Sequence, residues 1–254
     1  MPTTAIPTVA VTYIGGPTVL LEYASLRIVT DPTFDEPRRY PDPSGIDLVK
    51  SHGPAIARTD LGQVDLVLLS HNQHEDNLDY EGLELLAQGV RTLSTTKAAN
   101  DLFGGGVVGL DAWESYEVGD VAITAVPALH GPTGSESRLG PVIGFVLEAP
   151  GEPTVYISGD NASLPLVEQI ATRFPEIDIA LLFAGAGRIQ VFDSPITLTS
   201  ADAVIAAGML GASRVVGLHT EDWEHLTESR AQLASAFMAS GVLVDTPRGE
   251  RVEL

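Results

Sequence analysis

Cysteine is absent from this 254-residue chain, and its absence removes several kinds of chemistry. Without thiols the protein has no disulfides, no thiolate nucleophile and no cysteine-ligated zinc or iron–sulfur site. Positive charge is also scarce, because 14 Lys and Arg face 34 Asp and Glu and give a formal net charge of −20. Binding to a nucleic-acid backbone depends on basic side chains, so no nucleic-acid partner is expected.

Long apolar runs are missing as well. No uninterrupted stretch approaches the roughly 20 residues of a membrane helix, so no membrane partner is expected. The first seven residues lack the basic and apolar regions of a secretion signal. Together with the missing cysteine, these features favour a cytoplasmic location. A hydrophobic content of 44% is ordinary for a globular protein, and the length fits one large domain or two small ones.

What the sequence does contain is a series of short apolar runs that end in histidine or aspartate. Such runs, bounded by turn residues, are typical of buried strands. The runs at 65–69, 121–126, 154–157 and 214–218 lead, in that order, to His71, His74 and Asp76, to His130, to Asp160, and to His219. Open α/β and αββα folds place their sites at strand ends, so imidazoles and carboxylates gathered there suggest a metal centre.

The remaining pattern predicts strands and amphipathic helices in two β-rich halves that each end in helices, which suggests helix–sheet–sheet–helix layering. Further strands are expected at 8–14, 18–23, 26–30, 90–94, 116–118, 142–148 and 179–183. Helices are expected at 79–88, 95–103, 164–174, 200–210 and 227–240. The segment 31–59 has no clear period, and we expect a long surface loop that could form a wall or lid.

The segment with His71, His74 and Asp76 directly follows a buried strand. Imidazole and carboxylate suit divalent Zn, Mn or Fe, and a loop can turn them toward one point. A turn whose side chains only cap backbone groups would explain this segment equally well. The distant His130 and His219, together with Asp160, shift the balance toward a metal.

The order of these residues resembles the metallo-β-lactamase superfamily: a histidine cluster, a distant histidine, Ser158-Gly-Asp160 and a late histidine. The segments 13–22 and 26–32, Tyr-Ile-Gly-Gly-Pro-Thr-Val-Leu-Leu-Glu and Leu-Arg-Ile-Val-Thr-Asp-Pro, are similar to its ascorbate-6-phosphate-lactonase-like branch. The resemblance covers residues from about 9 to about 245. It implies an α/β fold, the αββα four-layer sandwich, and a single domain over residues 1–254.

The chain departs from the His-x-His-x-Asp-His loop of that family. Its loop is one residue longer, His-x-x-His-x-Asp-Asn, with Asn77 where the third histidine belongs. The resemblance implies a first metal site of His71, His74 and His130, and a second of Asp76, Asp160 and His219, with Asp160 able to bridge. An amide oxygen is a poorer zinc ligand than imidazole, so the second site is expected to be weak, to hold a harder ion such as Mn, or to be empty.

The resemblance therefore implies a metal-dependent hydrolase with one or two divalent ions, Zn or Mn. Metal-bound hydroxide would attack a small-molecule ester, lactone or phosphoester, because a bound ion lowers the pKa of its water from 15.7 to about 7. Asp76 would act as the catalytic residue that orients the nucleophile or accepts its proton. The alternatives are a non-catalytic metal-binding or ligand-sensing protein and an iron-dependent oxidoreductase; a homo-oligomer is compatible with each.

Four further residues are candidates for contact with substrate, each against a plainer interpretation. His225, six residues after His219, could contact substrate, but an exposed loop histidine is the commoner case. Trp223 could line the pocket or pack beneath its loop. His52 lies in the 31–59 segment, and Arg188 follows a glycine-rich turn and could meet an anionic substrate.

Two positions near the N-terminus also bear on the site. Asp31 stands before Pro32, and this arrangement favours a turn carboxylate that bonds backbone amides over a metal ligand. Gly16 stands where the lactonase-like branch often has a histidine, so any role of that histidine is in doubt in this chain.

Overall fold

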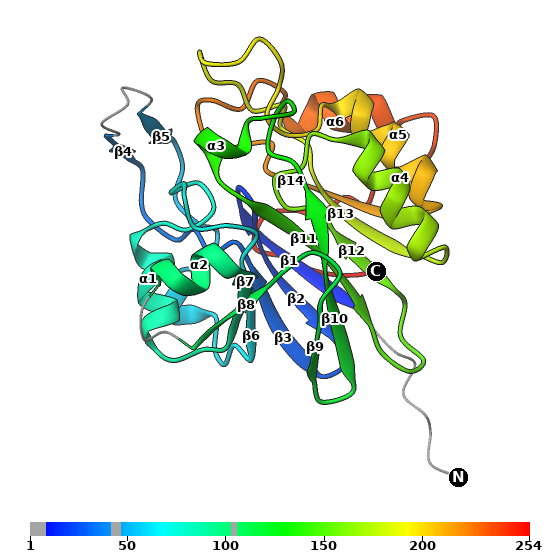
Figure 1. The fold of residues 1–254 in the computed structure, drawn as a ribbon, viewed down its shortest axis with the longest axis horizontal. Helices are drawn as coiled ribbons and strands as arrows, with labels where there is room; N and C mark the ends of the chain where they lie inside the picture. The colour runs from blue at the N-terminus through cyan, green and yellow to red at the C-terminus, as the bar shows by residue number, and fades with distance from the viewer. Residues whose placement is uncertain (1–8, 42–46, 103–105) are drawn as a thin grey trace.

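The structure is a computed structural model that describes residues 9–41, 47–102 and 106–254. Two β-sheets stack face to face, and helices cover their outer faces (Figure 1). The first sheet has seven strands in the order β15-β1-β2-β3-β6-β7-β8, and the second has six in the order β14-β13-β12-β11-β10-β9. The expected αββα fold is therefore confirmed.

The first sheet combines antiparallel and parallel pairing. Strands β15, β1, β2 and β3 pair antiparallel, whereas β3, β6, β7 and β8 pair parallel. Its strands are β1 (Ala10–Gly15), β2 (Thr18–Tyr23), β3 (Leu26–Thr30), β6 (Leu66–Leu68), β7 (Thr92–Thr95), β8 (Val107–Leu110) and β15 (Arg251–Glu253).

The second sheet is antiparallel from β9 to β12 and parallel from β12 to β14. Its strands are β9 (Ser115–Val118), β10 (Val121–Ala128), β11 (Val142–Glu148), β12 (Val155–Ile157), β13 (Ile179–Phe183) and β14 (Arg214–Leu218). A separate two-stranded ribbon is formed by β4 (Arg38–Tyr40) and β5 (Leu48–Lys50).

Most of the helices begin at a residue whose side chain caps the first turn, and α3 does not. They are α1 (Tyr80–Ala87), α2 (Thr96–Asp101), α3 (Glu136–Leu139), α4 (Leu164–Arg173), α5 (Ser200–Leu210) and α6 (Arg230–Phe237), with a 3₁₀ turn η1 at Arg58–Asp60. Asp79 accepts a bond from the Gly82 amide at the start of α1. Capping boxes open α5 at Thr199 and α6 at Ser229. Each cap satisfies amide groups that have no partner inside the helix.

Successive side chains along each strand point to opposite faces of its sheet, so the core is divided into three layers. On β2, Leu21 points between the sheets, where it joins β11 residues such as Phe145, whereas Leu20 points outward. The outer face of the first sheet packs against α1 through Leu85 and Leu86. The outer face of the second sheet packs against α4, α5 and α6. Both sheets are thus buried on two faces, as their nearly continuous apolar runs require.

The expected loop at 31–59 was wrong in part, because it contains β4, β5 and η1. Strands β8 and β15 were also not expected. Runs of three or four residues are too short to display a period, so long-range pairing decides them. The last helix begins at Arg230 instead of 227, since Ser229 caps it. Three predictions concern residues outside the described ranges: the strand start at residue 8, the helix end at residue 103, and the lack of a secretion signal in residues 1–7.

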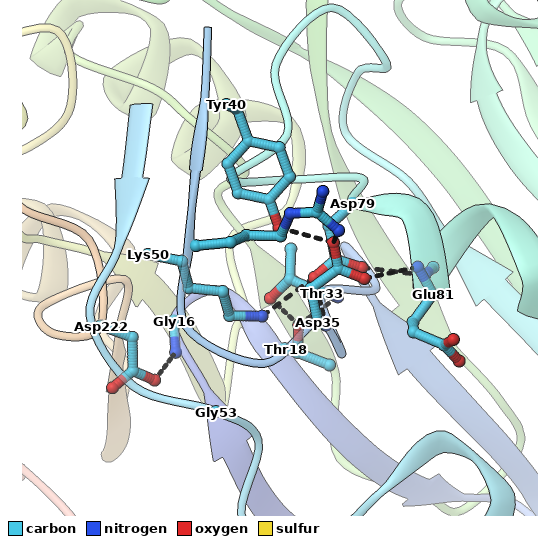
Figure 2. A network of polar contacts seen from close by, with 12 residues as sticks. Gly16, Thr18, Thr33, Asp35, Tyr40, Lys50, Gly53, Asp79, Glu81 and Asp222 are labelled. Atoms are coloured by element: carbon cyan, nitrogen blue, oxygen red, sulfur yellow. Dashed lines mark hydrogen bonds and ion pairs between the residues drawn. The ribbon is translucent and has the colours of Figure 1, made fainter. Parts of the chain in front are cut away.

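A buried polar network ties the 31–59 segment to the start of α1 (Figure 2). Asp79 Oδ2 accepts bonds from Lys50 Nζ at 2.9 Å and from the Asp35 amide at 2.7 Å. Asp35 in turn accepts from the Tyr40 hydroxyl at 2.8 Å and from the Glu81 amide at 2.9 Å. The side chains of Lys50 and Asp79 are 2% and 0% exposed. The network therefore fixes the β4–β5 ribbon against the helix that follows the 70–77 loop.

We expect the Asp79→Asn variant to lose about 3 kcal/mol or more of unfolding free energy, because it leaves the Lys50 ammonium buried without a counter-charge. The amide oxygen can still cap α1, whereas the NH2 group would face two donors, the Lys50 ammonium and the Asp35 amide, and this adds to the loss. Urea unfolding measures it. The matched control is Arg39→Gln, which breaks the exposed Arg39–Asp47 pair and should cost less than about 1 kcal/mol. Equal losses in the two variants would contradict a buried pair as the anchor.

Candidate metal centre

The strands of both sheets deliver their histidines and aspartates to one edge of the sandwich. His71 follows β6, His130 follows β10, Asp160 follows β12 and His219 follows β14. The two sheets meet here, because the Ile143 amide donates to the Ser70 carbonyl at 3.2 Å. Residues up to 148 positions apart in sequence, from His71 to His219, thereby share one site.

A first cluster consists of His71, His74 and His130, whose ligand atoms all lie within 4.8 Å of one another. His71 Nε2 is 2.9 Å from His74 Nδ1. His130 Nδ1 lies 2.7 Å from the Ile196 carbonyl, which can only accept, so this nitrogen carries the proton. The lone pair on His130 Nε2 is therefore free to bind a metal, and a partner of this kind on the other nitrogen is typical of metal-ligating histidine.

A second cluster consists of Asp76, His219 and His225, which also meet within 4.8 Å. Asp76 Oδ2 lies 3.3 Å from His219 Nε2 and 3.1 Å from His225 Nε2. His219 adopts a φ of +54°, and its amide donates to the Gly16 carbonyl at 2.7 Å. Such a backbone conformation is uncommon outside glycine and is often found at functional sites.

Asp160 lies between the two clusters and faces both. Its Oδ2 is 3.6 Å from His130 Nε2, and its Oδ1 is 3.7 Å from His219 Nδ1. The side chain is almost fully buried, and neither oxygen has a hydrogen-bond partner among the described residues. A carboxylate with one oxygen toward each cluster has the geometry of a bridge.

Burial sets the protonation of the first cluster. It lowers the pKa of His74 and of His130 to about 4, with His130 adding to the effect on His74. Burial also lowers the pKa of His71 well below its usual value. All three imidazoles are therefore neutral near pH 7, which is the form that binds a metal.

The pKa values of Asp76, Asp160 and His219 depend on burial and on the neighbouring charged groups. Burial raises the pKa of Asp160. For Asp76, burial is outweighed by the neighbouring imidazoles of His219 and His225, which hold its pKa well below the usual range. For His219, burial would lower the pKa, but the charges of Asp160 and Asp76 outweigh it and raise it. Asp76 therefore stays ionised near pH 7, and its carboxylate can attract a cation.

The unpartnered atoms of these residues fit a divalent ion. Within the described part of the chain, the following buried atoms have no hydrogen-bond partner: both oxygens of Asp160, both nitrogens of His219, Asp76 Oδ1 and His225 Nδ1. Buried polar atoms without partners are costly, and groups of them call for an explanation such as an ion. Imidazole nitrogen and carboxylate oxygen are donors that suit Zn, Mn and Fe.

Asp31 holds the loop that carries the first histidines. Its Oδ1 accepts from the Ser70 amide at 2.5 Å, and its Oδ2 accepts from Asn77 Nδ2 at 3.3 Å. Burial raises its pKa to about 8. This agrees with the structural role expected for Asp31, and it also explains Asn77, whose amide supports the loop.

The interpretation of His225 as an exposed loop histidine was wrong. Its side chain is only 12% exposed, because the Arg188 amide donates to the His225 carbonyl at 3.0 Å and a β-bridge pairs Gly187 with Leu226. These contacts turn the ring toward Asp76. The sequence signal for this placement was weak, since a six-residue interval after His219 matches neither helix nor strand periodicity.

The other three candidates for substrate contact belong to neither cluster. Trp223 is 3% exposed and packs beneath its loop, 5.6 Å from the Tyr40 ring and within cation–π distance of Lys50. Arg188 donates to the Asp193 carbonyl at 2.9 Å. His52 is 73% exposed and lies 3.6 Å from Asp222. Gly16, at φ +52°, packs on Trp223 and leaves no room for a larger side chain.

A cavity of about 210 Å³ opens over both clusters. It reaches four residues of the centre directly, His74, Asp76, His130 and His225. The rest of its lining is Leu48, Gln73, Glu75, Arg138, Leu139, Ile189, Val191 and Ile196. Sequence analysis did not select Arg138 or the aliphatic residues, because no local pattern distinguishes pocket walls from ordinary surface and core.

Comparisons with known proteins identify related sequences. The model of the "Beta-lactamase superfamily domain" family matches residues 26–220. A UPF0173 metal-dependent hydrolase of Pelotomaculum thermopropionicum is 29% identical over 96% of this chain and 99% of its own. Another, of Pyrococcus furiosus, is 25% identical over 77% of this chain and 84% of its own.

Solved structures share the fold. A possible metal-dependent hydrolase from Veillonella parvula has a TM-score of 0.83 at 20% identity and covers 98% of this chain and 100% of its own. An isothiocyanate hydrolase from Delia radicum gut bacteria has a TM-score of 0.81 at 22% identity and covers 96% and 98%. A diiron β-hydroxylase from Streptomyces venezuelae has a TM-score of 0.69 at 17% identity and covers 100% and 55%.

In the described part of the chain, no helix has the length and apolarity needed to cross a membrane. The expectation of an enzyme, a metal-dependent hydrolase, is confirmed by the curated relatives. With a family match over residues 26–220 and the same four-layer fold, the chain belongs to the metallo-β-lactamase superfamily.

Proposed function

We propose that this protein hydrolyses a small-molecule ester, lactone or phosphoester at a centre of two divalent ions, Zn or Mn. The observation that carries the proposal is the convergence of five histidines and two aspartates, with unpartnered buried atoms, beneath one cavity. The lactone option rests on the resemblance of residues 13–22 and 26–32 to the lactonase-like branch. A single domain over 1–254 and a cytoplasmic location stay predictions.

The two clusters divide the metal ligands between them. His71, His74 and His130 would hold the first ion, and Asp76, His219 and His225 the second, with Asp160 between them. Relative to the sequence-based ligand set, His225 is added. It supplies the imidazole that the loop lacks at Asn77, so the second site no longer depends on an amide oxygen.

The chemistry follows from charge and position. Bound divalent ions would acidify a water near neutral pH and polarise the carbonyl or phosphoryl oxygen of the substrate. Asp76 lines the cavity, and its Oδ1 has no hydrogen-bond partner among the described residues, so this atom is available to orient the attacking water or to take its proton. Neutral His74 and His130 at the cavity floor bring no positive charge of their own.

Two other functions are compatible with the same ligands. An iron-dependent oxidoreductase would use the clusters for oxygen chemistry, and the diiron β-hydroxylase shows that the fold can carry it, although the likeness at 17% identity extends to the fold alone. A ligand-sensing protein would bind the ions without turnover. Hydrolysis is favoured because the curated relatives are metal-dependent hydrolases.

We expect metal-stripped protein reconstituted with Zn or Mn to hydrolyse members of a panel of small esters, lactones and phosphoesters, and Asp76→Asn to lose at least about 100-fold in kcat/KM. Product release is followed by pH-stat titration, and oxygen uptake is recorded in parallel with Fe-loaded protein. Full metal occupancy without any hydrolysis would favour the sensing protein. Oxygen consumption by the Fe form alone would favour the oxidoreductase.

Metal content of purified variants tests the division of ligands. Wild-type protein should hold two equivalents, His130→Ala and His225→Ala about one each, and Asp160→Ala fewer than either, because Asp160 faces both clusters. Elemental analysis after dialysis gives the count. The matched control is His52→Ala, whose exposed ring lies outside both clusters and whose loss should leave two equivalents. A His225→Ala variant that keeps both ions would remove His225 from the centre.

Removal of metal should also lower stability. At a free-ion concentration of about 1,000 times Kd, binding adds about 4 kcal/mol to the native state, and for a chain of this size that corresponds to roughly 10 °C in Tm. Thermal unfolding with and without a chelator measures the shift, and added Zn or Mn should restore it. In the His130→Ala variant the shift should be smaller. Identical Tm values for stripped and loaded wild-type protein would speak against a structural contribution from the ions.

A further inference from the structure

The walls of the cavity over the metal centre are mostly aliphatic. Apart from the residues of the centre, eight residues line the cavity. Five are aliphatic, Leu48, Leu139, Ile189, Val191 and Ile196, and three are polar, Gln73, Glu75 and Arg138. Val191 is 37% exposed, although it is a large apolar side chain. Exposed apolar surface beside a cavity is typical of ligand sites, where burial of an apolar ligand group removes it from water. The cavity therefore fits the aliphatic part of a substrate.

One basic side chain lines the cavity, that of Arg138. It is exposed, and within the described residues it makes no ion pair and no side-chain hydrogen bond. Most other arginines of this acidic chain are engaged: Arg27, Arg58 and Arg248, for example, pair with carboxylates. With a net charge of −20 the protein repels anions at long range, so a free guanidinium at the cavity is a local exception.

The position of Arg138 is fixed relative to the metal ligands. It lies on α3, and Ser135, immediately before that helix, donates from its hydroxyl to the His130 carbonyl at 2.6 Å. The next residue, Leu139, is buried and lines the same cavity. The backbone that carries Arg138 is thus attached to the backbone of a ligand of the first cluster.

We propose that Arg138 binds an anionic group of the substrate, a carboxylate or a phosphate, while the aliphatic walls hold the chain between that group and the bond to be cleaved. This inference rests on the proposed hydrolase function. A planar guanidinium matches either anion with two parallel hydrogen bonds. A cavity of about 210 Å³ is smaller than the usual range for drug-sized ligands, so the substrate is a short-chain acid or phosphate.

The experiment compares esters that differ only in charge. The probes are 3-acetoxypropanoate, its neutral amide 3-acetoxypropanamide, and 2-acetoxyethyl phosphate, with acetate release measured on Zn-loaded protein. Wild-type protein should prefer an anionic probe to the amide in kcat/KM. Arg138→Gln should reduce that preference at least about tenfold with unchanged metal content, and Arg138→Lys should retain part of it. The preferred anion identifies the carboxylate or the phosphate as the natural group.

The matched control is Arg214→Gln. Arg214 is exposed and without an ion pair among the described residues, but it begins β14, whereas His219 follows the other end of that strand. Its loss removes the same charge from the chain and should leave the preference unchanged. An anion-to-amide ratio that is the same in wild-type protein and Arg138→Gln, or that falls equally in Arg214→Gln, would overturn the proposal.

A binding measurement separates this inference from the hydrolase function. Titration calorimetry with 4-methylpentanoate or isobutyl phosphate should show binding to loaded wild-type protein that Arg138→Gln weakens at least about tenfold and Arg214→Gln does not. Arg138-dependent binding without hydrolysis of any probe would sink the proposed function and support the anion site. Metal-dependent hydrolysis, with ligand binding that is equally strong in wild-type protein and Arg138→Gln, would support the proposed function and overturn the anion site.

Discussion

Burial of Asp76 and Asp160 at the junction of the two sheets creates a need for positive charge that the protein's own side chains meet only in part. An ionised carboxylate removed from water is costly unless it is paired or binds a metal. The surrounding imidazoles do not supply enough charge, since burial lowers the pKa of His74 and His130 to about 4. Only His219 is shifted toward its cationic form. In the proposed centre a divalent ion would complete the balance.

The fold places such a site at low structural cost because strands of both sheets end at the same edge. The donors stand on loops after the strands, where the backbone can turn them inward. Loops of this kind need support, and three of them have it: Asp31 holds the 70–77 loop, the Ile196 carbonyl orients His130, and the Gly16 carbonyl accepts from the His219 amide. The 31–59 segment adds a wider frame, since it bonds both to Asp79 and to the loop of His219 through Asp222.

The predictable part of this structure is the part that local patterns encode. Apolar runs with turn residues located most strands, cap residues located α5 to the residue, and the strand endings pointed to His71, His130, Asp160 and His219. The rest depends on pairing across the chain. Three-residue strands such as β4 and β15 are too short to show a period. The cavity walls come from separate segments, and nothing in the local sequence distinguishes their apolar residues from ordinary core residues.

His225 shows most clearly why the local sequence did not predict the members of the second cluster. By itself it is a polar residue on a loop, and exposure is the ordinary expectation. The bridge between Gly187 and Leu226 joins the loops that follow β13 and β14, two paired strands, and that bridge turns the ring inward. The sequence therefore contains the histidine but not the pairing that makes it a neighbour of Asp76.

The structure also gives a structural role to Asn77, the residue at which the loop departs from the family pattern. Its Nδ2 donates to Asp31, the carboxylate that also holds the Ser70 amide, so the residue has become part of the loop's support. A loop one residue longer than the family pattern has to be braced differently, and an amide that can donate serves this purpose where a metal-bound imidazole would not. In the proposed centre the lost ligand is replaced from the opposite side, by His225 on the loop after β14. In that proposed centre, an imidazole from a different position in the sequence would supply the same type of ligand.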